Sequence, residues 1–225
     1  MKSCEGAALV LALLAMCLLM ALGLALVLNT GTEVMIAAHF QAAQEAFYAA
    51  DAGLERTIDE LGGSADWNLV LQGLEHSMFV DGSPSTARTL ADGSTIDLST
   101  ATNVLNCRHA ANCTPAEMDA LTADRPWGLN NPRWTLYAHA PIAAIAASSS
   151  INSNVYVAVW VADDQSDSDN DPTSDGTDES NPGRGLIVVH SEAFGPGGAH
   201  QVVEATISRH APAERIRVIG WRRIN

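Results

Sequence analysis

Residues 7–28 read AALVLALLAMCLLMALGLALVL, and this stretch decides the fold of the 225-residue chain. None of its 22 side chains is charged or strongly polar. A helix of about 20 apolar residues, rising about 1.5 Å per residue, spans the roughly 30 Å hydrocarbon core of a bilayer. Residues 7–28 therefore predict one membrane-spanning helix, preceded by residues 1–6, MKSCEG.

Other N-terminal segments share part of this pattern. A cleaved secretory signal peptide has an apolar stretch of about 7–15 residues and a small-residue cleavage site, whereas this stretch is longer and lacks a clear site. A plain signal anchor for an exported domain fits its length. Lys2 before the stretch and Glu33 after it favour a single-pass helix with the N-terminus inside, in the inner membrane.

The helical pattern continues through residues 29–62. Apolar side chains recur there in steps of three and four, which places them on one stripe of an α-helix. The stripe consists of Ile36, Phe40, Ala43, Phe47, Ala50, Leu54, Ile58 and Leu61. Gly62 and Gly63 end the helix, as glycine commonly does. We expect the stripe to pack on a sheet of the following domain.

Residues 63–225 predict a β-rich globular domain large enough for its own core. Residues 64–132 are rich in Gly, Ser, Thr, Asn and Asp and predict mostly irregular structure with a brief helix at 115–123. Runs rich in β-branched and aromatic residues then predict strands. These runs are 133–140, 154–162, 185–194, 200–209 and 215–224. The predicted fold class is α+β, with a long N-terminal helix packed on an antiparallel sheet.

The helix carries a resemblance to a known family in two segments. GAALVLALLAMCLLMALGLAL begins at Gly6, and QEAFYAADAGLERTIDEL occupies residues 44–61. Over residues 6–61 the chain resembles type IV pilins, and more closely the PilX-type minor pilins, with Asp51 in place of the family's usual glutamate. The resemblance implies a structural subunit, not an enzyme, whose helix lies across an antiparallel sheet and binds other pilin subunits.

The resemblance also implies processing and assembly. A prepilin peptidase would cut between Gly6 and Ala7, and the new N-terminus would be methylated. Most major pilins carry a glutamate at the fifth mature position, where this chain has Leu11. That carboxylate pairs with a neighbour's amine in the filament, since an unpaired charge is costly in lipid. Leu11 therefore favours a subunit that primes assembly or occupies the filament tip; otherwise Leu11 is ordinary lipid-facing sequence.

Several functional alternatives stay open at this stage. The same segment suits a K-type minor pseudopilin of type II secretion, or a membrane-anchored, calcium-dependent adhesion domain. The net charge of −14 argues against nucleic acid as a partner. After assembly the protein would reside in a pilus, the periplasm or the extracellular space.

Cys107 and Cys113 lie in the segment NCRHAANC of the predicted exported domain. Their spacing suits a small disulfide loop in an oxidising compartment. Two free thiols, or a metal site aided by His109, are the alternatives, although zinc needs further ligands that the neighbouring sequence does not offer.

An acidic loop occupies residues 163–184 between two predicted strands. Its first part, DDQSDSDNDPTSDGTDE at 163–179, holds eight acids and no base. Five aspartates follow the one-three-five-nine-twelve spacing of calcium loops, namely Asp167, Asp169, Asp171, Asp175 and Asp178. Pro172 stands where an EF-hand needs glycine. The alternatives for this loop are therefore a calcium site and a solvated loop too polar to pack.

No sequence motif points to catalysis. GxSxG, P-loop, GxGxxG and HExxH patterns do not occur. His190 and Glu192 share one strand face, opposite His200 and Glu204 on the next strand, and we interpret these four residues as the solvent face of a hairpin.

Overall fold

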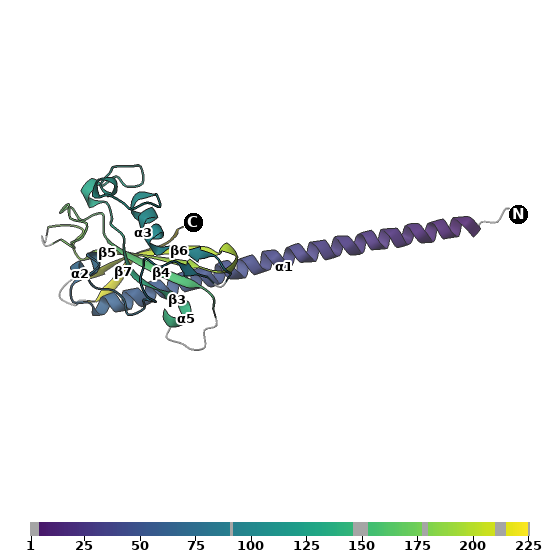
Figure 1. The fold of residues 1–225 in the computed structure, drawn as a ribbon, viewed down its shortest axis with the longest axis horizontal. Helices are drawn as coiled ribbons and strands as arrows, with labels where there is room; N and C mark the ends of the chain where they lie inside the picture. The colour runs from purple at the N-terminus through teal and green to yellow at the C-terminus, as the bar shows by residue number, and fades with distance from the viewer. Residues whose placement is uncertain (1–4, 91, 146–152, 177–179, 210–214, 225) are drawn as a thin grey trace. The chain divides into compact units, whose positions relative to one another are not determined.

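The computed structural model describes residues 5–90, 92–145, 153–176, 180–209 and 215–224. By its internal contacts the chain divides into two compact units, Met1–Gln41 and Ala42–Asn225. One helix, α1 (Glu5–Gly63), provides everything described in the first unit and also the first helix of the second unit (Figure 1).

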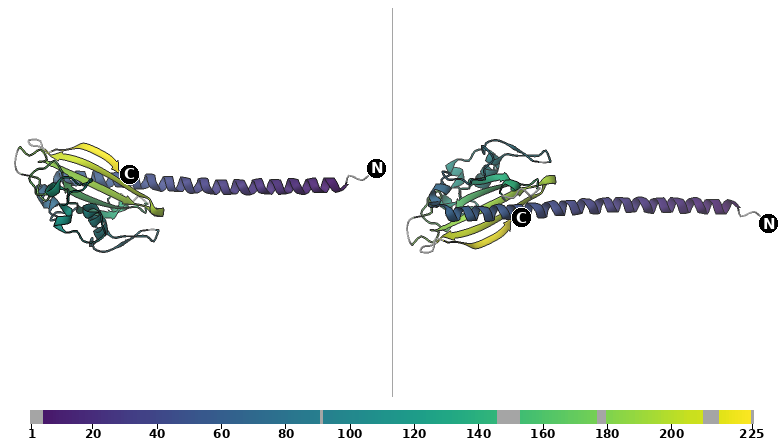
Figure 2. Two further views of the ribbon diagram at one scale, coloured as in Figure 1. Left: turned by 90° about the horizontal axis from the view of Figure 1, so that it is seen from above. Right: turned by 90° about the horizontal axis from the view of Figure 1, so that it is seen from below.

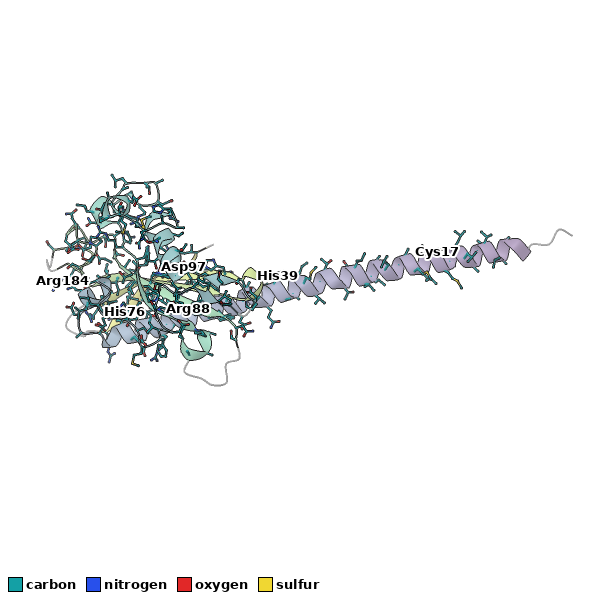
Figure 3. All side chains as sticks on the ribbon, viewed as in Figure 1. Cys17, His39, His76, Arg88, Asp97 and Arg184 are labelled. Atoms are coloured by element: carbon teal, nitrogen blue, oxygen red, sulfur yellow. A yellow bond between two sulfur atoms is a disulfide. The ribbon has the colours of Figure 1, made fainter. Side chains whose placement is uncertain are left out.

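The first unit exposes an apolar surface. Every described side chain from Ala7 to Gln41 is exposed, and leucines such as Leu11 and Leu26 are 67 and 68 % exposed. The helix is long and apolar enough to cross a membrane by length and composition. Because exposed apolar surface costs about 25 cal/mol per Å² in water, this surface suits lipid or apolar neighbours. Cys17, labelled in Figure 3, lies here with a free thiol.

The second unit is built on a five-stranded antiparallel sheet, which confirms the α+β class. Its strands pair in chain order, so each neighbour in the sequence is also a neighbour in the sheet. The strands are β3 (Thr135–Pro141), β4 (Tyr156–Asp163), β5 (Leu186–Phe194), β6 (His200–Arg209) and β7 (Ile216–Ile224). All eight residues of β4 are buried, so the central part of the sheet is covered on both faces.

Residues 42–63 of α1 cover one face of this sheet (Figure 2). Ala50, Leu54 and Leu61 are fully buried and pack in one core with Val157 and Val159 of β4. The helix and sheet approach closely because small residues line the contact.

Gly53 marks the closest approach between this helix and the sheet. A Cβ at Gly53 would lie 2.5 Å from Val157 Cγ1 and 3.2 Å from Ser191 Oγ, both in the sheet. Ser191 Oγ also donates a hydrogen bond to the carbonyl of Ala50 at 2.7 Å. The glycine of the Ala-Ala-Asp-Ala-Gly-Leu segment therefore has a packing role in this chain.

The opposite face is covered by short elements from the region expected to be mostly irregular. A second core joins Trp160 and Ala158 of β4 with Leu98, the first residue of α3 (Leu98–Cys107). Asp97, labelled in Figure 3, starts α3 by accepting a 2.8 Å hydrogen bond from Thr100 N, as N-cap residues do. The elements of this region are α2 (Trp67–Leu71), β1 (Arg88–Thr89), β2 (Thr95–Ile96), α3 (Leu98–Cys107), α4 (Pro115–Met118) and η1 (Gly128–Asn130). Of these, α2 packs in the first core, on the same face as α1. Two more, α5 (Ile142–Ile145) and η2 (Pro196–Gly198), lie between strands.

The predicted apolar stripe divides where the two units meet in the sequence. Its first members, Ile36 and Phe40, are 64 and 66 % exposed, whereas Ala50, Leu54 and Leu61 are fully buried. Ile36 and Phe40 precede Ala42, where the second unit begins. The helix expected at 115–123 is shorter, because α4 ends at Met118.

Candidate functional site

The predicted processing site lies at the start of α1. Gly6 and Ala7 are both helical, and the Ala7 side chain is exposed. Leu11, at the position of the pilin glutamate, is exposed one turn further on. Cleavage between Gly6 and Ala7 stays a prediction.

Cys107 and Cys113 are joined by a disulfide with a Cα–Cα distance of 6.0 Å. Cys107 is the last residue of α3, and Arg108 follows it in the left-handed conformation (φ 62°), which turns the chain back. His109, the suggested third metal ligand, instead lies 3.4 Å from Glu117. Because the sulfurs are bonded to each other, they offer no thiolate to a metal.

The alternating aspartates of the acidic loop form turns. Asp167, Asp169 and Asp171 each accept a hydrogen bond from the backbone N–H two residues on, which is the pattern of Asx turns. The accepted N–H groups belong to Asp169 (2.9 Å), Asp171 (2.7 Å) and Thr173 (3.1 Å). The alternating aspartates that resemble a calcium loop in the sequence thus also stabilise local turns of the backbone.

The structure brings only part of the predicted calcium set together. Asp167 and Asp175 lie with Asp163 in a cluster in which one oxygen of each carboxylate is within 4.8 Å of the others. Asp169 and Asp171 are exposed, and Asp178 lies outside the described residues. Asp163, at the end of β4, is the member that the sequence reasoning missed.

This cluster is buried, so the expectation of a loop too polar to pack was wrong. Asp163 and Asp167 are only 4 and 1 % exposed, and Asp175 is half-buried. Burial, followed by the charges of Asp167 and Asp175, raises the pKa of Asp163 to about 9. Burial also raises the pKa of Asp175 to about 6. Two full charges 4.8 Å apart would repel by about 3 kcal/mol at an effective dielectric constant of about 20.

Hydrogen bonds attach the loop to neighbouring elements. Asp175 N donates to Asn68 Oδ1 of α2 at 2.7 Å, and Asn170 N donates to Asn130 Oδ1 of η1 at 2.7 Å. A Cβ at Gly183 would lie 2.1 Å from Asp167 N, so only glycine allows the two loop segments to approach this closely. The cluster is therefore held by backbone packing from both ends of the loop.

A cavity of about 720 Å³ lies on the other face of the sheet from α1. Side chains of β5, β6 and β7 form its floor, and Arg108, Arg125, Trp127 and Trp134 contribute to its walls. Arg125 donates to three backbone carbonyls, so its guanidinium fixes the wall rather than pointing freely at a ligand.

The floor of this cavity holds the histidine–glutamate group. His190 Nε2 lies 3.0 Å from Glu192 Oε1, and His190 Nδ1 lies 3.3 Å from Glu204 Oε2. The remaining oxygens contact His200 Nε2 at 2.8 Å and Arg222 Nε at 2.9 Å. His190 and Glu204 are buried, so the interpretation as a solvent face was wrong for these two residues, whereas His200 is exposed. Residues from the segment 105–134 line the cavity above them.

The electrostatics of this group are those of a closed network. Burial alone lowers the pKa of His190, but its hydrogen bonds to Glu192 and Glu204 outweigh burial and raise it. Burial opposes the same bonds at Glu192, whose pKa falls to about 2. Every oxygen of Glu192 and Glu204 contacts a histidine or arginine nitrogen, so the arrangement orders the cavity floor and offers no free carboxylate as a general base.

A second buried histidine joins the edge of the sheet to the preceding loop. Asp81 Oδ1 accepts from Tyr156 OH at 2.8 Å and from Arg88 Nε at 2.8 Å, and lies 3.0 Å from His139 Nδ1. Burial raises the pKa of Asp81, but these three bonds outweigh it, so the pKa is lowered. All three partners meet on one carboxylate, which indicates a structural link.

Comparison with known proteins bears on the N-terminal segment. Residues 5–55 match a family model described as PilX N-terminal, which covers less than a quarter of the 225-residue chain. No curated protein and no solved structure matches the chain. The matched residues include the whole apolar stretch 7–28 and the Ala-Ala-Asp-Ala-Gly-Leu segment with Gly53. The comparison confirms that the N-terminal segment of this chain resembles the PilX-type minor pilins of type IV pili.

Proposed function

We propose that this chain is a minor pilin that is incorporated into a type IV pilus, where it primes assembly or occupies the tip. The observation that carries the proposal is the division of α1. Its residues 7–28 expose apolar side chains throughout, whereas Ala46–Leu61 contribute to the core of a folded domain. The PilX-type match covers most of both parts.

The exposed part of α1 suits two successive environments. In the inner membrane, with the N-terminus inside, lipid would cover residues 7–28. In a filament, the apolar helices of other pilin subunits would cover the same side chains. Processing by a prepilin peptidase between Gly6 and Ala7 would precede the transfer between these environments.

Leu11 supports a terminal position in the filament. A leucine cannot offer a carboxylate to the N-terminal amine of a neighbouring subunit. In pilins that carry the glutamate, pairing of the carboxylate with the amine offsets the cost of placing each charge in an apolar environment. A subunit at the tip needs to make fewer such pairings than a subunit in the shaft, which has neighbours on both sides.

The proposal is tested by locating the subunit on filaments. Filaments sheared from cells that produce an epitope-tagged chain are labelled with gold and viewed by electron microscopy. We expect label at one end of each filament. Label distributed evenly along the shaft would refute the tip position, and filaments without label would refute the pilin proposal itself.

Two variants at the same position sharpen this test. Leu11→Glu supplies the missing carboxylate, and Leu11→Ala is the matched control, which removes the leucine without adding charge. We expect Leu11→Ala to label one end as the unmodified chain does, and Leu11→Glu to label no more sites than Leu11→Ala. An increase in shaft label with Leu11→Glu alone would show an interior subunit.

A further inference from the structure

We propose that Asp163, Asp167 and Asp175 bind one calcium ion in the loop between β4 and β5. The site is independent of the pilin proposal, because it lies wholly within the second unit. It differs from the calcium set that the sequence spacing suggested, since it adds Asp163 and leaves Asp169 and Asp171 out.

Two buried oxygens carry this inference. Within the described residues, neither Asp163 Oδ1 nor Asp167 Oδ2 has a hydrogen-bond partner. Both side chains are more than nine-tenths buried, at 4 and 1 % exposed. Buried polar atoms nearly always have a partner, because the energy of their lost hydration must be replaced. A cation between these carboxylates supplies that partner.

The charges of the cluster point the same way. One oxygen from each of the three carboxylates lies within 4.8 Å of the others, and after burial the charges of Asp167 and Asp175 are the largest influences that raise the pKa of Asp163. Arg209 acts electrostatically on Asp175, but no cation is among the main influences on Asp163, which lies deeper. A divalent ion compensates two of the three negative charges and removes the repulsion between them.

The donor set selects calcium among the common metals. The cluster offers carboxylate oxygens and neither a thiolate nor an imidazole, which disfavours zinc and copper. Oxygens spread over as much as 4.8 Å suit the calcium–oxygen distance of about 2.3–2.6 Å better than the compact octahedron of magnesium at about 2.1 Å. Water and backbone carbonyls of the loop can complete the six to eight ligands that calcium prefers.

Calcium would fasten the loop to its surroundings. Asp175 also holds Gly185 N at 2.6 Å through Oδ1, and its own N–H donates to Asn68 of α2. Ion binding therefore joins the end of β4, the start of β5 and α2, and we expect it to raise the thermal stability of the second unit.

The test is calcium titration of the full chain, purified in a non-ionic detergent and freed of metal with a chelator. Binding is measured by calorimetry up to about 5 mM CaCl₂, which covers the 10⁻⁴–10⁻³ M range of extracellular calcium modules. Melting is followed in parallel by tryptophan emission. We expect one ion per chain, a rise in melting temperature with CaCl₂, and a smaller rise with MgCl₂.

Charge-matched variants locate the ion. Asp163→Asn and Asp167→Asn should each weaken calcium binding at least about tenfold, because each removes a charged ligand. Asp171→Asn is the control, since it removes the same charge from the same loop and its amide oxygen can still accept from Thr173. It should bind within about twofold of the unmodified chain.

The outcomes are decisive in each direction. Asp163→Asn should also melt at a higher temperature than the unmodified chain when calcium is absent, which shows that this variant folds. No calcium binding by the unmodified chain overturns the proposal, as do equal effects of CaCl₂ and MgCl₂, which indicate charge screening. Loss of binding in Asp171→Asn, with binding retained in Asp163→Asn, places the ion on the exposed aspartates instead.

Discussion

The contact between α1 and the sheet gives the sharpest test of the fold. Gly53→Ala should destabilise the second unit, although alanine is the better helix former by about 1 kcal/mol. The added Cβ would lie 2.5 Å from Val157 Cγ1, closer than non-bonded carbons approach, so the helix or the strand must move. Overpacking costs about 1–3 kcal/mol, and the shift also strains the bond from Ser191 to Ala50. With the upper value, because the overlap is severe, the net loss is about 2 kcal/mol.

The assay is urea unfolding of the full chain in a non-ionic detergent, followed by tryptophan emission. All five tryptophans lie in the second unit, and Trp67 and Trp160 are 1 and 0 % exposed, so the signal reports the unfolding of that unit. For an m-value of about 2 kcal/mol per M, the expected loss lowers the urea midpoint by about 1 M. The matched control is Gly62→Ala in the same helix, whose Cβ would meet Ile216 Cδ1 at an ordinary 3.7 Å.

A double-mutant cycle separates this overlap from other effects of the substitution. Val157→Ala alone should cost about 2 kcal/mol, because it removes buried methyl groups. Combined with Gly53→Ala it should cost about 1–2 kcal/mol less than the sum of the single variants, since the new methyl group occupies the vacated space. Strict additivity, or a Gly53→Ala midpoint equal to that of Gly62→Ala, would refute the close-packing argument.

Three further predictions address other parts of the chain. The pKa of His190 is raised in the folded chain, so its contribution to stability is fully present below its ordinary pKa of 6.5 and is lost as pH rises through its folded pKa. The pKa of Glu192 is lowered, so its contribution is lost as pH falls from 4.5 toward its folded pKa of about 2. The raised pKa of Asp163, about 9, lowers the unfolding free energy of the unmodified chain and of His190→Gln alike as pH rises from about 4 to about 9. The contribution of His190 should therefore appear as an additional decline above pH 6.5 in the unmodified chain relative to His190→Gln. Reducing the disulfide Cys107–Cys113 should cost about 2–3 kcal/mol, measured as a lower urea midpoint in dithiothreitol and absent from a variant with both cysteines changed to serine. Gly6→Leu should block processing, so that intact-mass spectrometry finds residues 1–6 retained, and a mature start at Ala7 in this variant would contradict the proposed cleavage.

The sequence predicts the five-stranded sheet of the second unit well because its strands are runs rich in β-branched and aromatic residues. All five strand ranges agree with the structure to within two residues at each end, and the range of β6 agrees at both ends. Continuous apolar runs such as that in β4 come from burial on both faces, which leaves a strong local signal. The order of the strands follows from their short connections and antiparallel pairing.

Burial of the polar groups could not be predicted in the same way, because it depends on distant segments. His190 and Glu204 become buried only because the segment from residue 96 to 134, which has little periodicity, folds back over the sheet. Nothing in the sequence distinguishes Asp163 from the other seven acids of the loop, because only the folded loop brings Asp175 close to it. A local sequence pattern shows which face of a helix or strand is apolar. It does not show whether another segment of the chain covers the polar face.

The division of α1 separates two kinds of sequence constraint that a single helical pattern conceals. From Ala46 to Leu61 a side chain must fit the sheet of its own domain, so substitutions there change the free energy of unfolding. From Ala7 to Phe40 no described side chain is buried, so apolar substitutions such as Leu14→Ile leave that free energy nearly unchanged and act only through lipid or neighbouring subunits. The stripe runs through both parts with the same spacing. Ile36 and Phe40 at its start are exposed, whereas Leu54 and Leu61 further along are buried in the core.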